Sequence, residues 1–144
     1  MISLKELNVE NWLEVANLSV SEEQKKIFQV PNVYWIGISR YEEHSTLFAI
    51  MHNDINIGLL GLGYDEDGIS GFINPLMIDE RYQGKGYSRQ AMQLAIEYLR
   101  TELKVPSINI GHRKENVVAG KLYESLGFVI VDEEEGNYCR RLVL

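Results

Sequence analysis

The chain has 144 residues, with 14 Lys and Arg residues against 21 Asp and Glu residues, which gives a formal net charge of −7 at pH 7. This length fits one folded domain with a substantial core, and 45% hydrophobic with 24% charged residues is ordinary for a soluble globular protein. The composition therefore excludes a disordered chain, a collagen-like repeat and a disulfide scaffold. The negative charge also argues against a general nucleic-acid binder, which needs a basic face.

The charge is unevenly distributed along the sequence. Residues 1–80 carry four basic and thirteen acidic side chains, whereas residues 81–121 carry eight basic and three acidic ones. One interpretation is an acidic surface that keeps the protein in solution. The other is a cationic partner on one side of the molecule and an anionic partner on the other.

The cysteine content and the N-terminal segment favour the cytoplasm. Cys139 is the one cysteine of the sequence, so an intrachain disulfide is excluded, which suits a reducing compartment. Residues 1–6 lack the basic region followed by an apolar stretch that marks a signal peptide. The apolar runs are too short to span a membrane, and we expect no membrane partner.

The first part of the chain combines one strand with short helical segments. Residues 2–7 favour a strand. A second short helix is predicted from Ser21, with that residue as its cap and acidic residues in the first turn. Residues 33–41 fit either a short helix or a loop. Between the strand and Ser21, apolar residues recur at helical spacing, at Val9, Trp12, Leu13 and Ala16.

Three strands follow, at residues 46–52, 57–64 and 69–78, joined by turns rich in Asn, Asp and Gly. The third is apolar on both faces at its end, which favours a central position in a sheet. Because proline has no N–H to donate to a ladder, Asn74-Pro75 predicts a bulge or a splayed stretch in this strand.

The longest helix is predicted at residues 84–101. Its buried stripe is predicted to be Tyr87, Ala91, Leu94, Ala95 and Tyr98. The remaining elements are a strand, a helix that ends at Gly127, and two closing strands, at residues 105–112, 116–126, 128–131 and 138–144. This order of elements predicts a mixed α/β domain built on one sheet.

Residues 77–88 lead from a strand through a glycine-containing loop into the long helix. Free N–H groups at a helix N-terminus bind anions, and Gly84 and Gly86 would let a pyrophosphate approach the backbone closely. Lys85 and Arg89 add positive charge. A P-loop is excluded because no Ser or Thr follows Lys85, and a dinucleotide fingerprint is weak because Arg89 stands where its third glycine belongs. A plain strand-to-helix turn that uses glycine stays open as an alternative.

A second pattern lies downstream, Asn116-x-x-Ala119-x-x-Leu122-Tyr123-x-x-x-Gly127-Phe128. With Gln83-Gly84-Lys85-Gly86-Tyr87-Ser88, which matches Gln/Arg-x-x-Gly-x-Gly/Ala except for Ser88, the chain resembles the GCN5-related N-acetyltransferase (GNAT) superfamily. Residues 77–86 and 122–128 look like bacterial diamine and spermine/spermidine acetyltransferases. Asn74-Pro75 departs from the aromatic-and-Arg stretch expected in such enzymes.

The resemblance implies a fold and a reaction. The fold is a mixed, mostly antiparallel central sheet flanked by helices, with splayed fourth and fifth strands, in a single acetyltransferase domain at residues 1–144. The reaction is transfer of acetyl from acetyl-CoA to an amine. It requires no metal, and the sequence shows no His, Cys and Asp cluster at metal-ligand spacing. A homodimer is a further expectation from the resemblance alone.

The resemblance also implies which residues bind the cofactor. Backbone N–H groups of residues 83–88 would hold the pyrophosphate, and the strand backbone freed after Pro75 would take the pantetheine arm and stabilise the oxyanion. Asn116 either caps its helix or contacts the cofactor. The implied cofactor-binding residues are Leu76, Met77, Ile78, Gln83, Gly84, Lys85, Gly86, Tyr87, Ser88, Arg89, Asn116 and Tyr123.

Tyr123 is the implied catalytic residue, because its phenol would protonate the leaving thiolate. Its alternative role is that of a core tyrosine, since it shares a helix face with apolar residues. The amine arrives protonated, and a carboxylate acting through a water would take its proton. His112 is interpreted mainly as a packed histidine. The candidate bases are Glu80, Glu22, Glu23, Glu42 and Glu43.

The leading hypothesis for the acceptor is a small cationic amine, a polyamine or diamine. Such a chain of positive charges calls for a slot lined with carboxylates and aromatic faces, and the early helices and the acidic turn at residues 65–67 offer both. The predicted substrate-binding residues are Glu22, Glu23, Tyr34, Glu42 and Glu80. The alternatives are a protein or peptide amine, an aminosugar, or a non-catalytic CoA-binding module.

Overall fold

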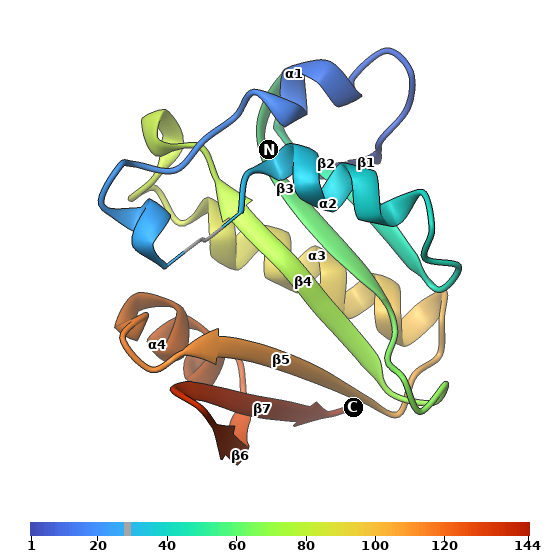
Figure 1. The fold of residues 1–144 in the computed structure, drawn as a ribbon. Helices are drawn as coiled ribbons and strands as arrows, with labels where there is room; N and C mark the ends of the chain where they lie inside the picture. Colours follow the sequence, from blue (N-terminus) through green and yellow to red (C-terminus); the bar gives the residue numbers. More distant parts are fainter. Residues whose placement is uncertain (28–29) are drawn as a thin grey trace.

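A seven-stranded sheet with strand order β1-β2-β3-β4-β5-β7-β6 organises the chain (Figure 1). The computed structural model describes residues 1–27 and 30–144. Neighbouring strands pair antiparallel except β4 and β5, which are parallel, so the mixed and mostly antiparallel sheet is confirmed. The strands are β1 (Ile2–Glu6), β2 (Ser45–His52), β3 (Ile55–Tyr64), β4 (Gly71–Ile78), β5 (Ser107–Arg113), β6 (Val129–Glu134) and β7 (Asn137–Val143).

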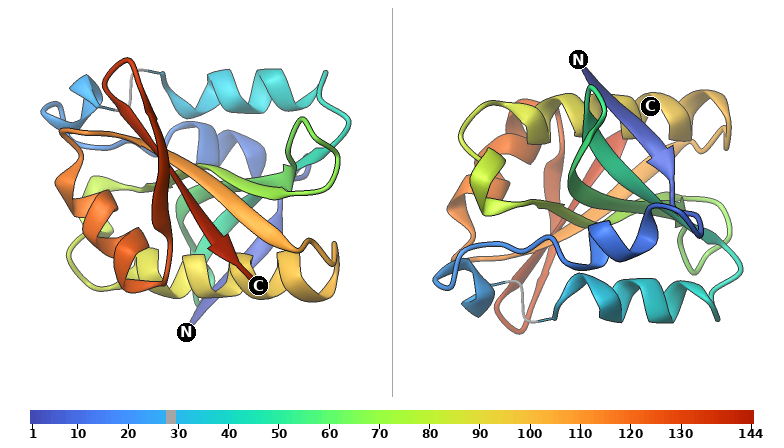
Figure 2. Two further views of the ribbon diagram at one scale, coloured as in Figure 1. Left: turned by 90° about the horizontal axis from the view of Figure 1, so that it is seen from below. Right: turned by 90° about the horizontal axis from the view of Figure 1, so that it is seen from above.

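Helices cover both faces of the sheet, and Figure 2 shows α2 and α3 on opposite sides with α4 on the α3 side. The α-helices are α1 (Trp12–Ala16), α2 (Asn32–Ser39), α3 (Tyr87–Thr101) and α4 (Val117–Ser125). Two short 3-10 helices, η1 (Gln24–Lys26) and η2 (Glu80–Tyr82), lie in the connections. Within the described residues, no helix combines the length and the apolar composition that crossing a membrane requires.

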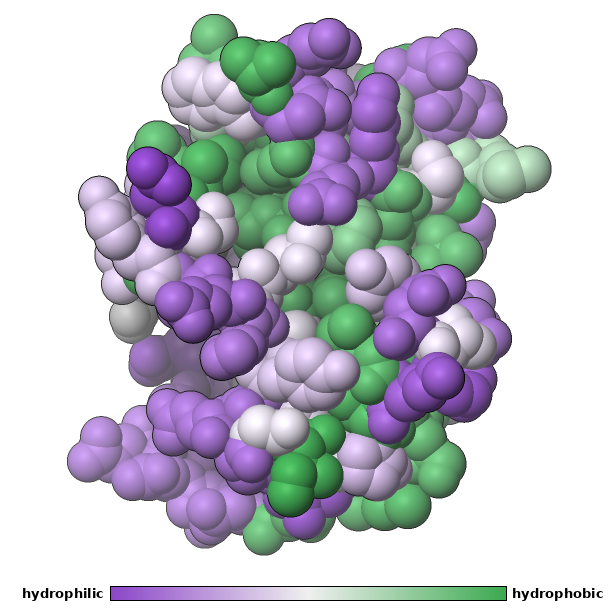
Figure 3. Space-filling view, turned by 90° about the vertical axis from the view of Figure 1, so that its right-hand side faces the viewer, coloured by the Kyte–Doolittle hydropathy of each residue, from purple (hydrophilic) through white to green (hydrophobic). Residues whose placement is uncertain are grey.

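Two apolar clusters hold the helices on the sheet. Alternate residues of a strand point to opposite faces, so Phe48 and Leu60 join the cluster under α3 whereas Ala49 and Leu59 join the cluster under α1 and α2. The central strands β2 and β3 are therefore buried on both faces. The face drawn in Figure 3 mixes hydrophilic residues with a central hydrophobic area, an ordinary surface for a folded domain.

The parallel pair β4 and β5 separates soon after it forms. The pairing consists of Gly71 with Ile108 and Phe72 with Asn109, and the two strands then diverge (Figure 1). The register between β3 and β4 also shifts at this level, between Leu60 and Leu62. The splayed fourth and fifth strands are confirmed, although the separation begins at Phe72, before Pro75.

Several local predictions were wrong in detail. In α3, Leu94 is 39% exposed, because the buried face instead carries Met92, Ile96 and Leu99. The α1 helix has five residues, and it buries Val15 and leaves the predicted Trp12 and Leu13 exposed.

Several element starts also differ from the prediction, among them that of α3, which begins at Tyr87 and not at residue 84. The short helix after Ser21 is the single 3-10 turn η1, where the Ser21 Oγ accepts a hydrogen bond from the Gln24 N–H (3.2 Å). The β4 strand begins at Gly71 and not at residue 69, because the Asp67 carboxylate accepts the N–H groups of Ile69 and Ser70 (2.8 Å each) and holds them in a turn.

Candidate active site

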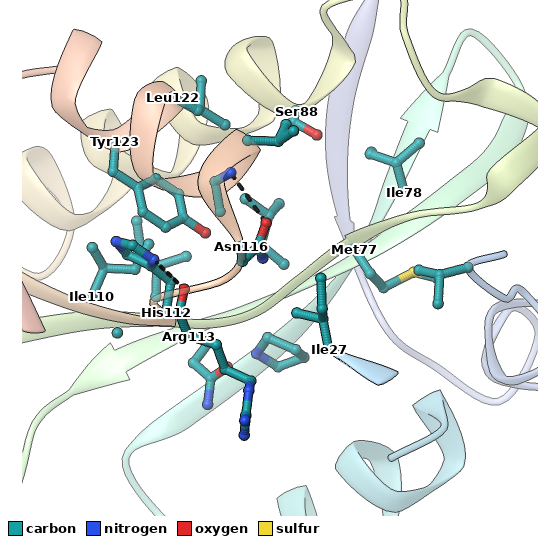
Figure 4. Close-up of a pocket in the computed structure, with 18 of the residues that line it drawn as sticks. Ile27, Met77, Ile78, Ser88, Ile110, His112, Arg113, Asn116, Leu122 and Tyr123 are labelled. Atoms are coloured by element: carbon teal, nitrogen blue, oxygen red, sulfur yellow. Dashed lines mark hydrogen bonds between the residues drawn. The ribbon is translucent and has the colours of Figure 1, made fainter. Parts of the chain in front are cut away.

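The divergence of β4 and β5 opens a cleft of about 1370 Å³. Its lining comes from β4 and β5, from the first turns of α3 and α4, and from η1 and α2 on the far side (Figure 4). Leu76, Met77 and Ile78 of β4 line the cleft. These are the residues after Pro75 whose backbone is expected from the sequence to be free of a strand partner. Since β5 has turned away, this stretch of β4 pairs only with β3 among the described residues. A strand edge is therefore open to a ligand.

The glycine loop lies at the end of this open strand. Gly84 and Gly86 have φ angles of +76° and +79°, in the left-handed region, and a Cβ atom at either position would meet no atom within 4 Å. These glycines are thus needed for backbone conformation, and the space beside them is free. Gly86 is the N-cap of α3 and provides no side-chain cap, so the first N–H groups of the helix stay available to an anion.

Two polar side chains fix the start of the loop. The Asp79 carboxylate is buried and accepts hydrogen bonds from the Ser19 N–H (3.0 Å), the Arg81 N–H (3.0 Å) and Arg81 Nε (2.8 Å). Burial opposes ionisation, but these hydrogen bonds prevail and hold the pKa of Asp79 below its usual range. The Gln83 Nε2 donates to the Ile78 carbonyl (2.7 Å) and to Gln24 Oε1 (3.0 Å), which ties the loop to β4 and η1.

The remaining loop residues divide into two groups. Tyr87, Ser88 and Arg89 line the cleft together with Gln83, Gly84 and Gly86, whereas Lys85 does not contribute to its lining. Arg89 also donates to the Ser125 Oγ (2.5 Å), which joins the first turn of α3 to the end of α4.

Tyr123 is both a residue of the apolar core and a residue of the cleft. Its ring lies in the core on the α3 side, with Phe128 and His112 as aromatic neighbours at centroid distances of 6.1 and 5.7 Å. The residue is 6% exposed, yet its hydroxyl points into the cleft (Figure 4). Burial raises the pKa of Tyr123 to about 12. The phenol is thus a protonated group at the cleft surface at neutral pH.

Asn116 is the N-cap residue of α4 and also a residue of the cleft. Its Oδ1 accepts the Ala119 N–H (3.3 Å), so it caps the helix as the sequence suggested. It also lines the cleft near the Tyr123 hydroxyl (Figure 4). The two interpretations of Asn116 are compatible.

The predicted acceptor residues do not all gather at the cleft. Glu23 and Tyr34 line it, whereas Glu22, Glu42 and Glu80 are not part of its lining. Glu22 forms an exposed ion pair with Lys25 (2.7 Å). Glu42 accepts the Ser45 hydroxyl (3.0 Å).

Two further carboxylates line the cleft, Asp65 and Glu115. Asp65 accepts a hydrogen bond from the Asn109 Nδ2 (2.9 Å) where β4 and β5 separate. A hydrogen bond from Arg113 (2.6 Å) holds the pKa of Glu115 below its usual range. Sequence reasoning considered Asp65 only as part of an acidic turn and did not select Glu115, because their approach to the cleft depends on the splay.

Fold and site together define an acetyltransferase. A family profile described as the acetyltransferase (GNAT) family matches residues 2–128, and the chain belongs to this family. The chain is 26% identical over 141 residues to the spermine/spermidine N(1)-acetyltransferase of Bacillus subtilis (strain 168), which covers 94% of this chain and 93% of that relative.

Solved structures share the fold over nearly the whole chain. The spermidine N-acetyltransferase from Vibrio cholerae in complex with CoA and spermine superposes with a TM-score of 0.78 at 19% identity, covering 99% of this chain and 94% of that one. The Campylobacter jejuni N-acetyltransferase PseH in complex with acetyl coenzyme A has a TM-score of 0.73 at 21% identity, covering 99% of both chains.

Proposed function

We propose that this protein, acting as one domain over residues 1–144, transfers an acetyl group from acetyl-CoA to a primary amine of a polyamine or diamine. The observation that carries the proposal is the Tyr123 hydroxyl, which projects from a buried ring into a cleft that has the glycine loop at one end. Carboxylates and aromatic rings line the same cleft. The proposal thus rests on a proton donor placed between sites for an anionic and a cationic ligand.

The residues of the cleft fit acetyl-CoA. The free N–H groups at the start of α3 and the open space beside Gly84 and Gly86 suit a pyrophosphate, and Arg89 adds charge. The open edge of β4 at residues 76–78 suits the amide-containing pantetheine arm, since an extended chain with amides pairs with a free strand edge. When bound, acetyl-CoA supplies the acetyl group as a thioester that a neutral amine can attack.

Tyr123 acts in this proposal as the general acid. Because burial raises its pKa to about 12, Oη keeps its proton at neutral pH and has that proton available for the leaving group. The hydroxyl makes no hydrogen bond with another side chain or backbone group in the described part of the chain, so it is free to turn toward a ligand. An N–H of the open β4 edge would stabilise the oxyanion.

The acceptor part of the proposal is supported by the lining of the cleft and by the relatives. Glu23, Asp65 and Glu115 bring carboxylates to it, and Tyr34 and Trp35 bring aromatic faces. Such a combination suits a chain that carries several ammonium groups. One of these carboxylates, acting through a water, would take the proton of the attacking amine; of the bases considered from sequence, Glu23 lines the cleft.

The test is an amine panel assayed by thiol release from acetyl-CoA. Spermine, spermidine and putrescine are compared with butylamine, glucosamine and a lysine peptide. We expect kcat/KM for a polyamine to exceed that for butylamine by about tenfold or more, because each additional ion pair in a partly buried site is worth about 1.4 kcal/mol or more. Turnover no better than with butylamine would refute the polyamine assignment, and preference for the peptide or the sugar would replace it.

A charge-neutral variant sharpens the test of the acceptor site. We expect Glu23→Gln to raise KM for spermidine about tenfold and to leave KM for acetyl-CoA unchanged. Glu10→Gln is the matched control, since Glu10 is exposed and does not line the cleft. Equal values for the two variants would exclude Glu23 from the acceptor site.

A further inference from the structure

Arg140, on β7, is a buried cation without a carboxylate partner among the described residues. It is 8% exposed. Its Nε donates to His112 Nε2 (2.9 Å), and its Nη1 donates to the Phe128 carbonyl (3.3 Å). A buried guanidinium requires acceptors, because it cannot shed its charge. The imidazole of His112 is therefore an essential acceptor for Arg140.

This hydrogen bond fixes the tautomer of His112. A guanidinium N–H can only donate, so His112 Nε2 must be the accepting nitrogen. The proton of the neutral ring is then on Nδ1, which lies 2.9 Å from the Arg113 carbonyl oxygen and donates to it (Figure 4). Both nitrogens are occupied, so the ring is held in one orientation at the wall of the cleft.

The fixed ring of His112 packs against the ring of Tyr123. The two rings meet edge to face, with centroids 5.7 Å apart and an interplanar angle of 60°. His112 is thus a direct contact of the side chain whose hydroxyl enters the cleft, and it belongs to the sheet and not to the helix that carries Tyr123.

Gly120 allows helix α4 to pack closely against His112 and Arg140. A Cβ atom at Gly120 would lie 3.0 Å from His112 Cε1, 3.4 Å from His112 Nε2 and 3.5 Å from Arg140 Nη2. Glycine inside a helix is less favourable than alanine by about 0.5–1 kcal/mol, so its position here is explained by the close approach. Gly120 precedes Tyr123 by three residues and lies on a neighbouring part of the same face.

We propose that His112 is a positioning residue for the acetyl-transfer reaction and that its packing against Tyr123 determines where the Tyr123 hydroxyl lies in the cleft. Arg140 holds His112 through a hydrogen bond, and Gly120 leaves the space that His112 needs beside α4. This inference rests on the proposed function of Tyr123 as general acid. Misplacement of a reacting group by about 1 Å can lower a rate about 100-fold. The cluster of His112, Arg140 and Gly120 would therefore control kcat through the placement of the Tyr123 hydroxyl.

The test measures kcat and KM for Gly120→Ala and His112→Gln, alone and combined with Tyr123→Phe, using acetyl-CoA and spermidine. Gln keeps an acceptor for Arg140 but has no ring to pack on Tyr123. We expect each single variant to lower kcat about 10- to 100-fold with KM for acetyl-CoA unchanged, and to have no further effect once Tyr123 is Phe. The matched control is Gly37→Ala, also a helical glycine, where a Cβ would meet nothing within 4 Å.

A second measurement does not depend on activity. In protein labelled with ¹³C at the tyrosine ring, the Tyr123 resonance is assigned by its absence in Tyr123→Phe. We expect Gly120→Ala and His112→Gln to shift this resonance and Gly37→Ala to leave it in place, with the melting temperature showing that each variant is folded.

The outcomes separate the two proposals. Unchanged kcat in both His112→Gln and Gly120→Ala, or losses that simply multiply with that of Tyr123→Phe, would overturn the positioning role and leave the general acid intact. Full activity in Tyr123→Phe would overturn both.

Discussion

Replacing Tyr123 by Phe should separate catalysis from stability more cleanly than any other change in this protein. The ring of Tyr123 is part of the core, whereas its hydroxyl lies at the cleft and has no hydrogen-bond partner among the described residues. Phe keeps the ring and removes only the oxygen. We expect the variant to fold as the parent protein does and to lose most of its turnover.

The magnitudes follow from this geometry. A net hydrogen bond contributes about 0.5–1.5 kcal/mol to stability, and since none is lost, Tyr123→Phe should change the free energy of unfolding by less than about 1 kcal/mol. Tyr123→Ala should cost about 3–5 kcal/mol, because it leaves a cavity beside Phe128 and His112. A general acid is worth about 10²–10⁴ in rate, so kcat of Tyr123→Phe should fall by this factor.

The assay is steady-state thiol release, with acetyl-CoA binding measured separately by calorimetry and unfolding followed by urea titration. The pH dependence provides a second check. With the pKa of Tyr123 raised to about 12, its proton is retained as pH rises, so kcat should show no alkaline fall from this group below about pH 11. A Tyr123→Phe variant that retains kcat within about threefold would refute the general-acid role.

Three other substitutions test the supporting structure. Gly86→Ala should raise KM for acetyl-CoA and destabilise the fold by about 1–2 kcal/mol, because φ is +79° there; acetyl-CoA titration and thermal melting measure both effects, and equal binding would contradict the loop assignment. Gly58→Ala should destabilise by about 1–3 kcal/mol in urea, since its Cβ would lie 2.3 Å from the Met77 carbonyl oxygen, and an unchanged midpoint would mean that β3 and β4 are not so close. Asp79→Asn should cost about 1.5–3 kcal/mol at pH 7 by weakening charge-assisted hydrogen bonds. Because the pKa of Asp79 is lowered in the fold, that stabilisation is complete above the ordinary pKa near 4 and disappears as pH falls through the lowered value, so urea midpoints of the two proteins should converge below about pH 4; a constant difference would refute it.

The sheet and the glycine loop were predictable because their signals are local. Alternating strands, the turn residues between them and Asn74-Pro75 lie in short windows of sequence, and the splay they predicted is present. Gly84 and Gly86 are likewise a local signal in the sequence, and they predict the start of α3. These features depend on backbone conformation, which neighbouring residues determine.

The buried faces of the helices were less predictable because apolar residues occur on more than one side. In α3, Leu94 and Met92 are both apolar, and only the position of β1, β3 and β4 beneath the helix decides that Met92 is the buried one. In α1, Trp12 and Leu13 fit the helical spacing but face outward. Tertiary packing, which no local window contains, selects between such faces.

The contact of Arg140 with His112 shows a further limit of sequence reasoning. Arg140 lies in a closing strand between half-buried Cys139 and exposed Arg141, and nothing nearby in sequence marks it as buried. Its partner is on β5, which pairs with β7 so that Ile110 faces Arg140 and His112 faces Tyr138. Only this register, with α4 packed over it, places the two side chains together behind Tyr123.

The fold shows which of the unevenly distributed charges of the sequence line the cleft. The splay of β4 and β5 brings charged residues of the acidic first half and of the more basic stretch that follows to one cleft. Glu23 and Asp65 line it from the first half, whereas Arg89 lines it beside the glycine loop and Lys85 stays outside. Glu115, from the more basic stretch, contributes a carboxylate. The charges that the proposed function requires for acetyl-CoA and a cationic acceptor are thus those that the separation of β4 from β5 exposes, and a variant that alters only the remaining surface charge should change solubility and not specificity.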